Sequence, residues 1–296
     1  MFHGTITALV TPFRDGAIDE DAFRAHVERQ IEAGVDAIVP AGTTGEAATL
    51  SFDEHKALIR MAVEQAAGRV PVIAGAGSNN TAESIELTRA ARELGADAAL
   101  LISPYYNKPT QEGIYQHYRA VAEAVHLPQI LYNVPGRTAS SIQPETVGRL
   151  ARIPNIVGIK DATADMDQLV RLMAEAGDAI RYLSGDDATV TPFMALGGHG
   201  VISVVSNVAP ERMKALTEAM RAGDAPRAAA IQRELAPLNA AMFMQSNPIP
   251  VKAACAMMGW MGWEIRLPLT VLPEAGRERL AGELRAAGLS PERVHP

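Results

Sequence analysis

The chain has 296 residues, of which 48% are hydrophobic and 21% charged, a composition typical of a globular protein with a large core. Its net charge of -7 argues against nucleic acid as a partner, because a phosphate-binding surface needs clustered lysine and arginine. We find no secretion signal and no apolar run long enough to cross a membrane, and the single cysteine, Cys255, permits no internal disulfide. We therefore expect a cytoplasmic protein.

Short runs rich in Val, Ile and Leu alternate with amphipathic stretches from the start of the chain to about residue 223. The runs mostly lack polar alternation, which is typical of strands in a parallel sheet that is covered on both faces. Taken in chain order, the predicted strands and the helices that follow them are 5–10 with 19–34, 37–40 with 53–67, 70–77 with 81–95, 98–104 with 110–125, 128–135 with 143–152, 156–160 with 165–177, 180–185 with 187–197, and 200–206 with 208–222.

Eight strand–helix units in this length favour a closed (β/α)8 TIM barrel over an open doubly wound sheet. After residue 224 the strand pattern stops, and the remaining stretch reads as helices with proline and glycine breaks. The sequence therefore predicts an α/β protein with a catalytic barrel domain over 1–224 and a C-terminal helical domain over 225–296.

In a TIM barrel the active site lies at the C-terminal ends of the strands and in the loops that follow them. Polar residues at the predicted strand ends are therefore the candidates for chemistry. They are Thr43, Thr44, Tyr105, Tyr106, Asn107, Tyr132, Asn133, Arg137, Lys160, Asp161, Asp186 and Asp187, together with Gly185.

Lys160 ends the buried-looking strand "IVGIK", whereas the other lysines, at positions 56, 108, 214 and 252, fall in predicted helices or loops. Unlike arginine, lysine can become a neutral amine inside a protein, and a neutral amine attacks a ketone to form an imine. The alternative is a structural ion pair between Lys160 and Asp161 or another acid.

Tyr132 lies one strand–helix unit before Lys160, on the neighbouring predicted strand. Adjacent strands are about 4.8 Å apart, so the phenol can reach the lysine or its bound substrate. Imine formation requires protons to be delivered and removed, and a tyrosine can do both. The alternative is a core aromatic residue whose hydroxyl is satisfied by the fold.

The turn "GTTGE" at 42–46 presents backbone N–H groups and the hydroxyls of Thr43 and Thr44, which together could hold a carboxylate. The alternative is a strand-to-helix turn in which Thr44 caps a helix. The histidines form neither an HxH nor an HExxH pattern, so the sequence predicts no metal site and argues against a metal-dependent aldol mechanism.

Several segments together resemble the dihydrodipicolinate synthase (4-hydroxy-tetrahydrodipicolinate synthase) family of the pyruvate-dependent class I aldolase superfamily. They are "GTTGEAATL", "SPYYNKPTQEGIYQHY", "YNVPGRT", "GIKDAT", "LSGDDA", "GGHGVISVVSN" and "NPIPVKAA". The resemblance implies a lyase that needs no cofactor. It implies condensation of pyruvate with L-aspartate 4-semialdehyde to 4-hydroxy-tetrahydrodipicolinate, on the route to diaminopimelate and lysine.

The resemblance also implies roles for individual residues. Lys160 would form the Schiff base with pyruvate. Tyr132, Thr43 and Tyr106 would form a proton relay, with Tyr106 supplied by a neighbouring subunit of a homotetramer, a dimer of dimers. The implied substrate-binding residues are Thr44 for the pyruvate carboxylate, Arg137 for the carboxylate of the semialdehyde, and Gly185 and Ile202 as carbonyl groups lining the site.

A lysine-binding site at the dimer interface is implied by the same resemblance. The matching positions are Ala48, His55, Gly77, Asn79, Glu83 and Tyr105. Phe52 stands where well-known members have histidine, which implies weak or altered feedback inhibition. Two other readings stay open: a 2-keto-3-deoxy sugar-acid aldolase or sialic-acid lyase on the same scaffold, and a non-catalytic lysine-sensing barrel.

Overall fold

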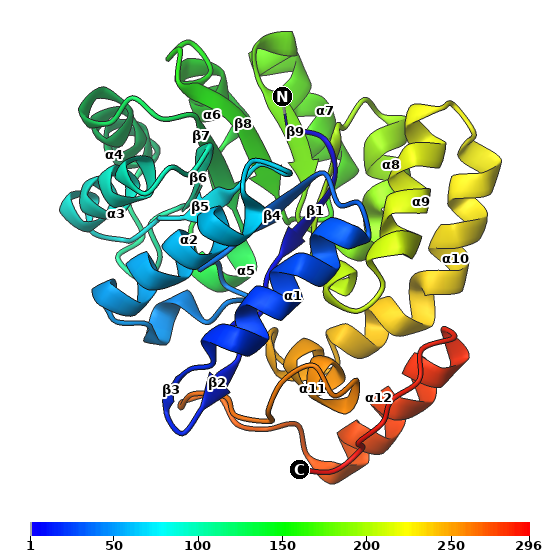
Figure 1. Cartoon of the computed structure of the whole chain (residues 1–296). Helices are drawn as coiled ribbons and strands as arrows, with labels where there is room; N and C mark the ends of the chain where they lie inside the picture. Colours follow the sequence, from blue (N-terminus) through cyan, green and yellow to red (C-terminus); the bar gives the residue numbers. More distant parts are fainter. Residues whose placement is uncertain (1) are drawn as a thin grey trace.

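The computed structural model describes residues 2–296 and forms a closed parallel barrel surrounded by helices (Figure 1). The sheet has eight strands in the order β4-β1-β10-β9-β8-β7-β6-β5, and a bridge between Ile38 and Val72 joins its two edges. The strands are β1 Gly4–Ala8, β4 Ala37–Val39, β5 Ile73–Gly75, β6 Ala98–Ile102, β7 Gln129–Asn133, β8 Ile156–Asp161, β9 Arg181–Ser184 and β10 Gly200–Ser203. The predicted TIM barrel and all eight of its strands are confirmed.

The predicted helices are present, with boundaries close to those expected. The α-helices are α1 Glu20–Glu32, α2 Phe52–Ala66, α3 Thr81–Glu93, α4 Gln111–Ala124, α5 Pro135–Thr138, α6 Pro144–Leu150, α7 Met166–Ala176, α8 Val190–Ala195, α9 Pro210–Arg221, α10 Ala225–Met242, α11 Ile249–Met257 and α12 Glu274–Ala286. The 3-10 turns are η1 Ala47–Thr49, η2 Gly177–Ala179, η3 Asp187–Thr189 and η4 Val205–Asn207.

Side-chain caps set several of these helix starts. Asp19 caps α1 by accepting a hydrogen bond from the backbone N–H of Ala22. Ser51 and Glu54 form a reciprocal capping box at the start of α2. Each cap satisfies backbone N–H groups that the first helical turn leaves without partners.

Several local features differ from the expectation, among them the short helix α5, which begins at the residue where the predicted strand 128–135 ends. The helix predicted over 187–197 begins as the 3-10 turn η3 and becomes α8 only at Val190, because the Asp187 carboxylate turns inward and accepts hydrogen bonds from the backbone N–H groups of Val204 and Val205. A short antiparallel hairpin, β2 Phe13–Arg14 with β3 Ala17–Ile18, precedes α1 and was not predicted.

Alternating strand residues fill the interior of the barrel, as expected for a closed parallel sheet. This inner layer includes Ile6, Val39, Ile130, Tyr132 and Ile202, all at most 7% exposed. Separate apolar layers lie between the strands and the surrounding helices.

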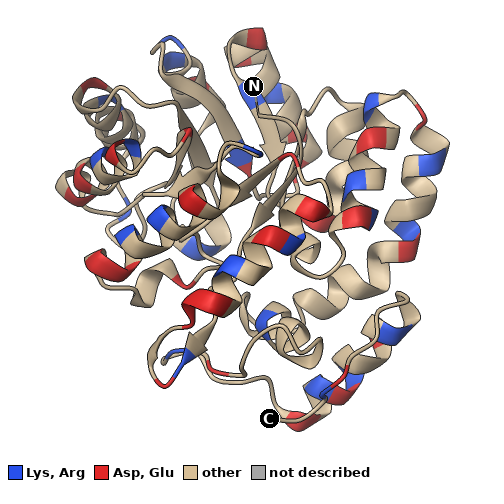
Figure 2. Ribbon diagram, viewed as in Figure 1, with Lys and Arg blue, Asp and Glu red and all other residues tan. Residues whose placement is uncertain are grey.

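The C-terminal helices pack directly on the barrel. Leu235 and Leu238 of α10 share an apolar cluster with Val201 of β10 and Met213 of α9. Figure 1 shows α11 on the same side of the barrel as the β2–β3 hairpin. Figure 2 shows charged residues mainly along the helices and loops, with both signs interspersed. Among the described residues, no helix is both long and apolar enough to cross a membrane.

Candidate active site

Lys160 and Tyr132 face each other across two neighbouring strands. They are partners in the parallel register of β7 and β8, as are Asn133 and Asp161. The Nζ atom of Lys160 lies 4.2 Å from the centre of the Tyr132 ring. Both residues are buried, at 6% and 7% exposure, so the amine and the phenol meet inside the mouth of the barrel.

No carboxylate of residues 2–296 forms an ion pair with Lys160. The neighbouring Asp161 carboxylate is engaged elsewhere, because it accepts hydrogen bonds from Asn133 Nδ2 at 2.9 Å and Thr163 Oγ1 at 2.5 Å. The alternative in which Lys160 pairs with Asp161 is therefore wrong. Burial raises the pKa of Asp161, and the bonds from Thr163 and Asn133 oppose that shift.

Gly185 and Ile202 complete the walls around Lys160. A Cβ atom on Gly185 would stand 2.6 Å from the Ala162 Cβ and 3.0 Å from the Lys160 Cε, so only glycine leaves room for the lysine stem. Ile202 is 1% exposed and belongs to the same inner layer as Tyr132.

The "GTTGE" loop follows β4 and is held as a tight turn. Backbone N–H groups of Gly45 and Ala47 donate to the carbonyl of Gly42, at 3.0 and 3.1 Å. Thr44 is 2% exposed, whereas Thr43 is half-buried. The alternative in which Thr44 caps a helix is wrong, because its hydroxyl instead accepts a hydrogen bond from Asn247 Nδ2 at 3.1 Å.

Glu46, the last residue of this loop, anchors it to the C-terminal part of the chain. Its backbone is in the left-handed region, with φ of 59°, and its side chain is 1% exposed. One carboxylate oxygen accepts from Lys252 Nζ at 2.5 Å and the other from the backbone N–H of Arg266 at 3.0 Å. Burial lowers the pKa of Lys252, although the charge of Glu46 opposes the shift.

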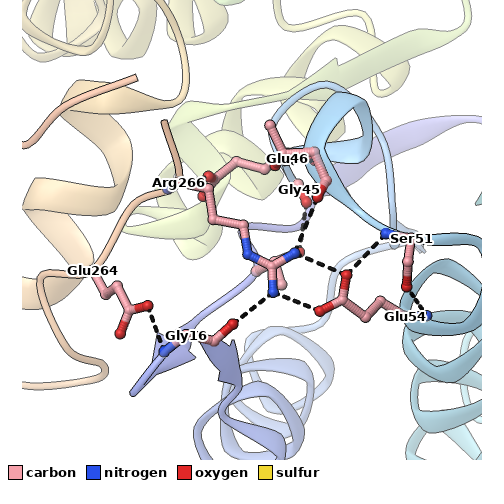
Figure 3. A network of polar contacts seen from close by, with 9 residues as sticks. Gly16, Gly45, Glu46, Ser51, Glu54, Glu264 and Arg266 are labelled. Carbon is pink, nitrogen blue, oxygen red and sulfur yellow. Dashed lines mark hydrogen bonds and ion pairs between the residues drawn. The ribbon is translucent and has the colours of Figure 1, made fainter. Parts of the chain in front are cut away.

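Arg266 extends this anchor to two more segments (Figure 3). Its guanidinium forms a bidentate pair with Glu54 at 2.5 and 2.8 Å and donates to the carbonyls of Gly16 at 2.8 Å and Thr49 at 3.1 Å. The hydrogen bonds from Arg266 lower the pKa of Glu54 to about 2. Arg266 thus ties together the loop, through its backbone N–H, and the hairpin and the start of α2, through its guanidinium.

Arg137 lies on α5, just past the end of β7. Its Nη2 donates to the carbonyl oxygen of Asn247 at 3.0 Å. Asn247 therefore contacts both of the residues predicted to hold substrate carboxylates, Thr44 through its side chain and Arg137 through its backbone.

Tyr106 stands apart from the other predicted catalytic residues. Its side chain is 88% exposed, and its backbone φ of 69° lies in the left-handed region, which is unfavourable for a bulky residue. Within one chain, Tyr106 extends into solvent, away from the buried pair Lys160 and Tyr132.

The residues predicted to bind lysine lie on three successive loops and helices. Asn79 Nδ2 donates to the Tyr105 carbonyl at 3.1 Å, and Glu83 accepts from Ser78 Oγ at 2.7 Å. His55 is buried on α2, with its Nε2 2.5 Å from the Gly75 carbonyl, and burial lowers its pKa. Gly77 precedes Ser78, and Ala48 lies in η1.

Sequence reasoning did not identify Glu46, Lys252, Arg266 and Asn247 as parts of the site. Lys252 was expected to be an ordinary helix or loop residue; it lies on α11 and is 3% exposed. One sequence feature could have indicated them: Asn247 and Lys252 flank the apolar, proline-containing stretch "PIPV".

Comparison with known proteins agrees with this geometry. The model of the dihydrodipicolinate synthetase family matches residues 1–287. The 4-hydroxy-tetrahydrodipicolinate synthase of Nitratidesulfovibrio vulgaris (strain DP4) is 54% identical over 289 residues, covering 97% of this chain and 99% of that protein.

Two solved structures are similarly close. The chloride-inhibited dihydrodipicolinate synthase from Acinetobacter baumannii, complexed with pyruvate, is 50% identical with a TM-score of 0.96, covering 98% of this chain and 100% of the other. The dihydrodipicolinate synthase from Cyanidioschyzon merolae with lysine bound is 41% identical with a TM-score of 0.95, covering 97% and 99%. The chain, with a paired lysine and tyrosine in its barrel, belongs to the dihydrodipicolinate synthetase family.

Proposed function

We infer that this protein condenses pyruvate with L-aspartate 4-semialdehyde to give 4-hydroxy-tetrahydrodipicolinate, in the biosynthesis of diaminopimelate and lysine. Membership of the family supports the reaction. The observation that carries the mechanism is the buried Lys160 amine, 4.2 Å from the Tyr132 ring and in no ion pair within residues 2–296.

In this proposal, the Lys160 amine attacks the ketone carbon of pyruvate, and water leaves as the imine forms. Tyr132 supplies and removes the protons that these steps require. Loss of a methyl proton turns the imine into an enamine, which attacks the aldehyde carbon of the second substrate. The amine of that substrate then displaces Lys160, which closes the ring and frees the enzyme.

Substrate binding is assigned to the groups around this pair. Thr44 holds the pyruvate carboxylate, and the carbonyls of Gly185 and Ile202 line the site. Arg137 clamps the carboxylate of the semialdehyde, for which its planar guanidinium is suited. Support for the last assignment is the position of Arg137 on α5, held by the Asn247 carbonyl at 3.0 Å.

Thr43 and Tyr106 extend the proton relay from Tyr132 toward solvent, with Tyr106 supplied by a neighbouring subunit. The 88% exposure of Tyr106 in the single chain supports this arrangement, because the side chain is accessible to a neighbouring subunit. We propose a homotetramer built as a dimer of dimers. We also place the enzyme in the reducing cytoplasm, in keeping with a single free cysteine, Cys255.

L-Lysine is the proposed feedback inhibitor, supported by the lysine-bound relative from Cyanidioschyzon merolae. The proposed site comprises Ala48, His55, Gly77, Asn79, Glu83 and Tyr105. Phe52 is 42% exposed and offers no hydrogen bond to an amino acid, so we expect weak or altered inhibition.

Trapping tests the function directly. Incubation with pyruvate and borohydride should add the reduced pyruvate unit to Lys160, as read by peptide mass spectrometry. Absence of that adduct would contradict the mechanism.

Turnover of aspartate 4-semialdehyde should exceed turnover of sugar-acid aldehydes. The R137Q variant should lose semialdehyde turnover while still forming the pyruvate adduct. Preference for a sugar aldehyde would instead identify an aldolase of the superfamily.

A further inference from the structure

Asn247 contacts two residues of the proposed substrate site. Its side-chain Nδ2 donates to Thr44 Oγ1 at 3.1 Å, and its backbone carbonyl accepts from Arg137 Nη2 at 3.0 Å. The residue is 6% exposed. This single buried residue therefore contacts both Thr44, proposed to bind pyruvate, and Arg137, proposed to bind the semialdehyde.

The other side-chain atom of Asn247, Oδ1, is buried and has no hydrogen-bond partner among residues 2–296. Leaving such an acceptor unpaired costs about 1–3 kcal/mol, so native proteins rarely do so without a reason. A donor on a bound ligand would remove this cost. The unpaired Oδ1 is thus an acceptor that an N–H or O–H group of a bound ligand can satisfy.

The chemistry of the proposed second substrate supplies that donor. L-Aspartate 4-semialdehyde has its amino group and its carboxylate on the same carbon atom. If Arg137 holds the carboxylate, the amino group must lie beside the Arg137 guanidinium. Asn247 is beside it too, since its backbone carbonyl accepts from that guanidinium.

We propose that Asn247 Oδ1 accepts a hydrogen bond from the amino group of the semialdehyde and so makes the site selective for α-amino aldehydes. This inference rests on the proposed function and adds a specificity-determining residue to it. Arg137 recognises a carboxylate that many aldehyde acids share, whereas Asn247 recognises the amine that also closes the ring.

Succinate 4-semialdehyde tests the proposal, because it is the same acceptor without the amino group. Rates are followed as loss of pyruvate for each aldehyde, since the amine-free acceptor cannot cyclise. In N247L, kcat/KM for aspartate 4-semialdehyde should fall about 10- to 100-fold relative to that for succinate 4-semialdehyde, the effect of losing one buried hydrogen bond to substrate. N247S, whose hydroxyl is too short to reach, should show the same loss and replaces N247L if the larger change prevents folding.

One variant separates recognition from structural damage. N239L is the matched control, because Asn239 is also buried with an unpaired Oδ1 but lies on α10, where its Nδ2 contacts the Asp187 carbonyl. That variant should keep the wild-type ratio.

The outcomes distinguish this inference from the proposed function. A wild-type protein that forms no adduct with pyruvate on Lys160 contradicts both. A wild-type protein that forms the adduct, with an unchanged aldehyde ratio in N247L or N247S, overturns the role of Asn247 alone. An equal loss of selectivity in N239L overturns it as well, because the effect would then be unspecific.

Discussion

Two buried lysines, Lys160 and Lys252, have almost the same surroundings and different expected roles. They are 6% and 3% exposed, and each Nζ lies over an aromatic ring, at 4.2 Å from Tyr132 and 4.5 Å from Phe13. Lys252 Nζ forms an ion pair with Glu46 Oε1 at 2.5 Å, whereas Lys160 has no ion pair within the described residues. Burial and an aromatic neighbour therefore do not distinguish a reactive lysine from a structural one, but the presence of a carboxylate does.

Replacing Lys160 is the strongest test of this contrast. K160M removes the proposed nucleophile but no ion pair, so kcat should fall about 10⁴-fold or more while the free energy of unfolding changes by about 1 kcal/mol at most. Steady-state kinetics and urea unfolding measure the two effects. A large loss of stability, or retained turnover, would show that Lys160 is structural.

Replacing Lys252 should give the opposite result. K252M leaves the Glu46 carboxylate buried without its partner, so the free energy of unfolding should fall by about 3–5 kcal/mol. Pyruvate should still form an adduct with Lys160 at temperatures where the variant is folded. The double variant E46Q/K252M should recover part of the stability, because it removes the uncompensated charge.

Lys56 supplies a matched control for the second variant. Its pair with Glu86, at 3.2 Å, is partly exposed, so K56M should change the stability by about 0.5 kcal/mol or less. If K56M and K252M changed the free energy of unfolding equally, burial of the Glu46–Lys252 pair would add nothing to its contribution to stability.

Tyr132 differs from Phe13 in carrying a hydroxyl on the ring that the lysine faces. Y132F keeps the ring and its packing, so stability should change by about 1 kcal/mol or less. Because proton transfer loses its donor, kcat should fall about 100-fold, and imine trapping with borohydride should slow. Wild-type rates in Y132F would assign Tyr132 the same packing role that Phe13 has beside Lys252.

Lowering the pH should gradually reduce the stability of the contacts around Arg266, because Glu54 becomes protonated. The pKa of Glu54 is lowered to about 2 by Arg266, so its contribution to stability is present above the ordinary value of 4.5 and is lost as pH falls toward 2. The effect should stay below about 1 kcal/mol, because the pair is partly exposed. Urea unfolding between pH 5 and pH 2.5 should show a shallower decline for E54Q than for the wild type.

The sequence was sufficient to predict the barrel and the proximity of Tyr132 and Lys160. Each strand is a compact apolar run, and one strand–helix repeat separates Tyr132 from Lys160, which fixes them as neighbours in a parallel sheet. Such periodic patterns are local, so they can be recognised without knowing any distant contact.

The anchoring contacts could not be predicted in the same way. Glu46 and Lys252 are separated by 206 positions, and nothing near either residue identifies the other. The turn η3 was missed because Asp187 reaches across to the backbone after β10, a contact that overrides the local helical pattern. The exposure of Tyr106, at 88%, likewise follows from the path of the chain around it and not from a local sequence pattern.

The bonds from Arg266 to Glu46, Gly16 and Glu54 also affect the order in which the folded protein is completed during synthesis. During translation the N-terminal segments leave the ribosome first, and the strands of the barrel can begin to associate early. The "GTTGE" loop, however, obtains its last ties only when Arg266 has been synthesised. Catalytic competence should therefore arise late, as a property of the almost finished polypeptide.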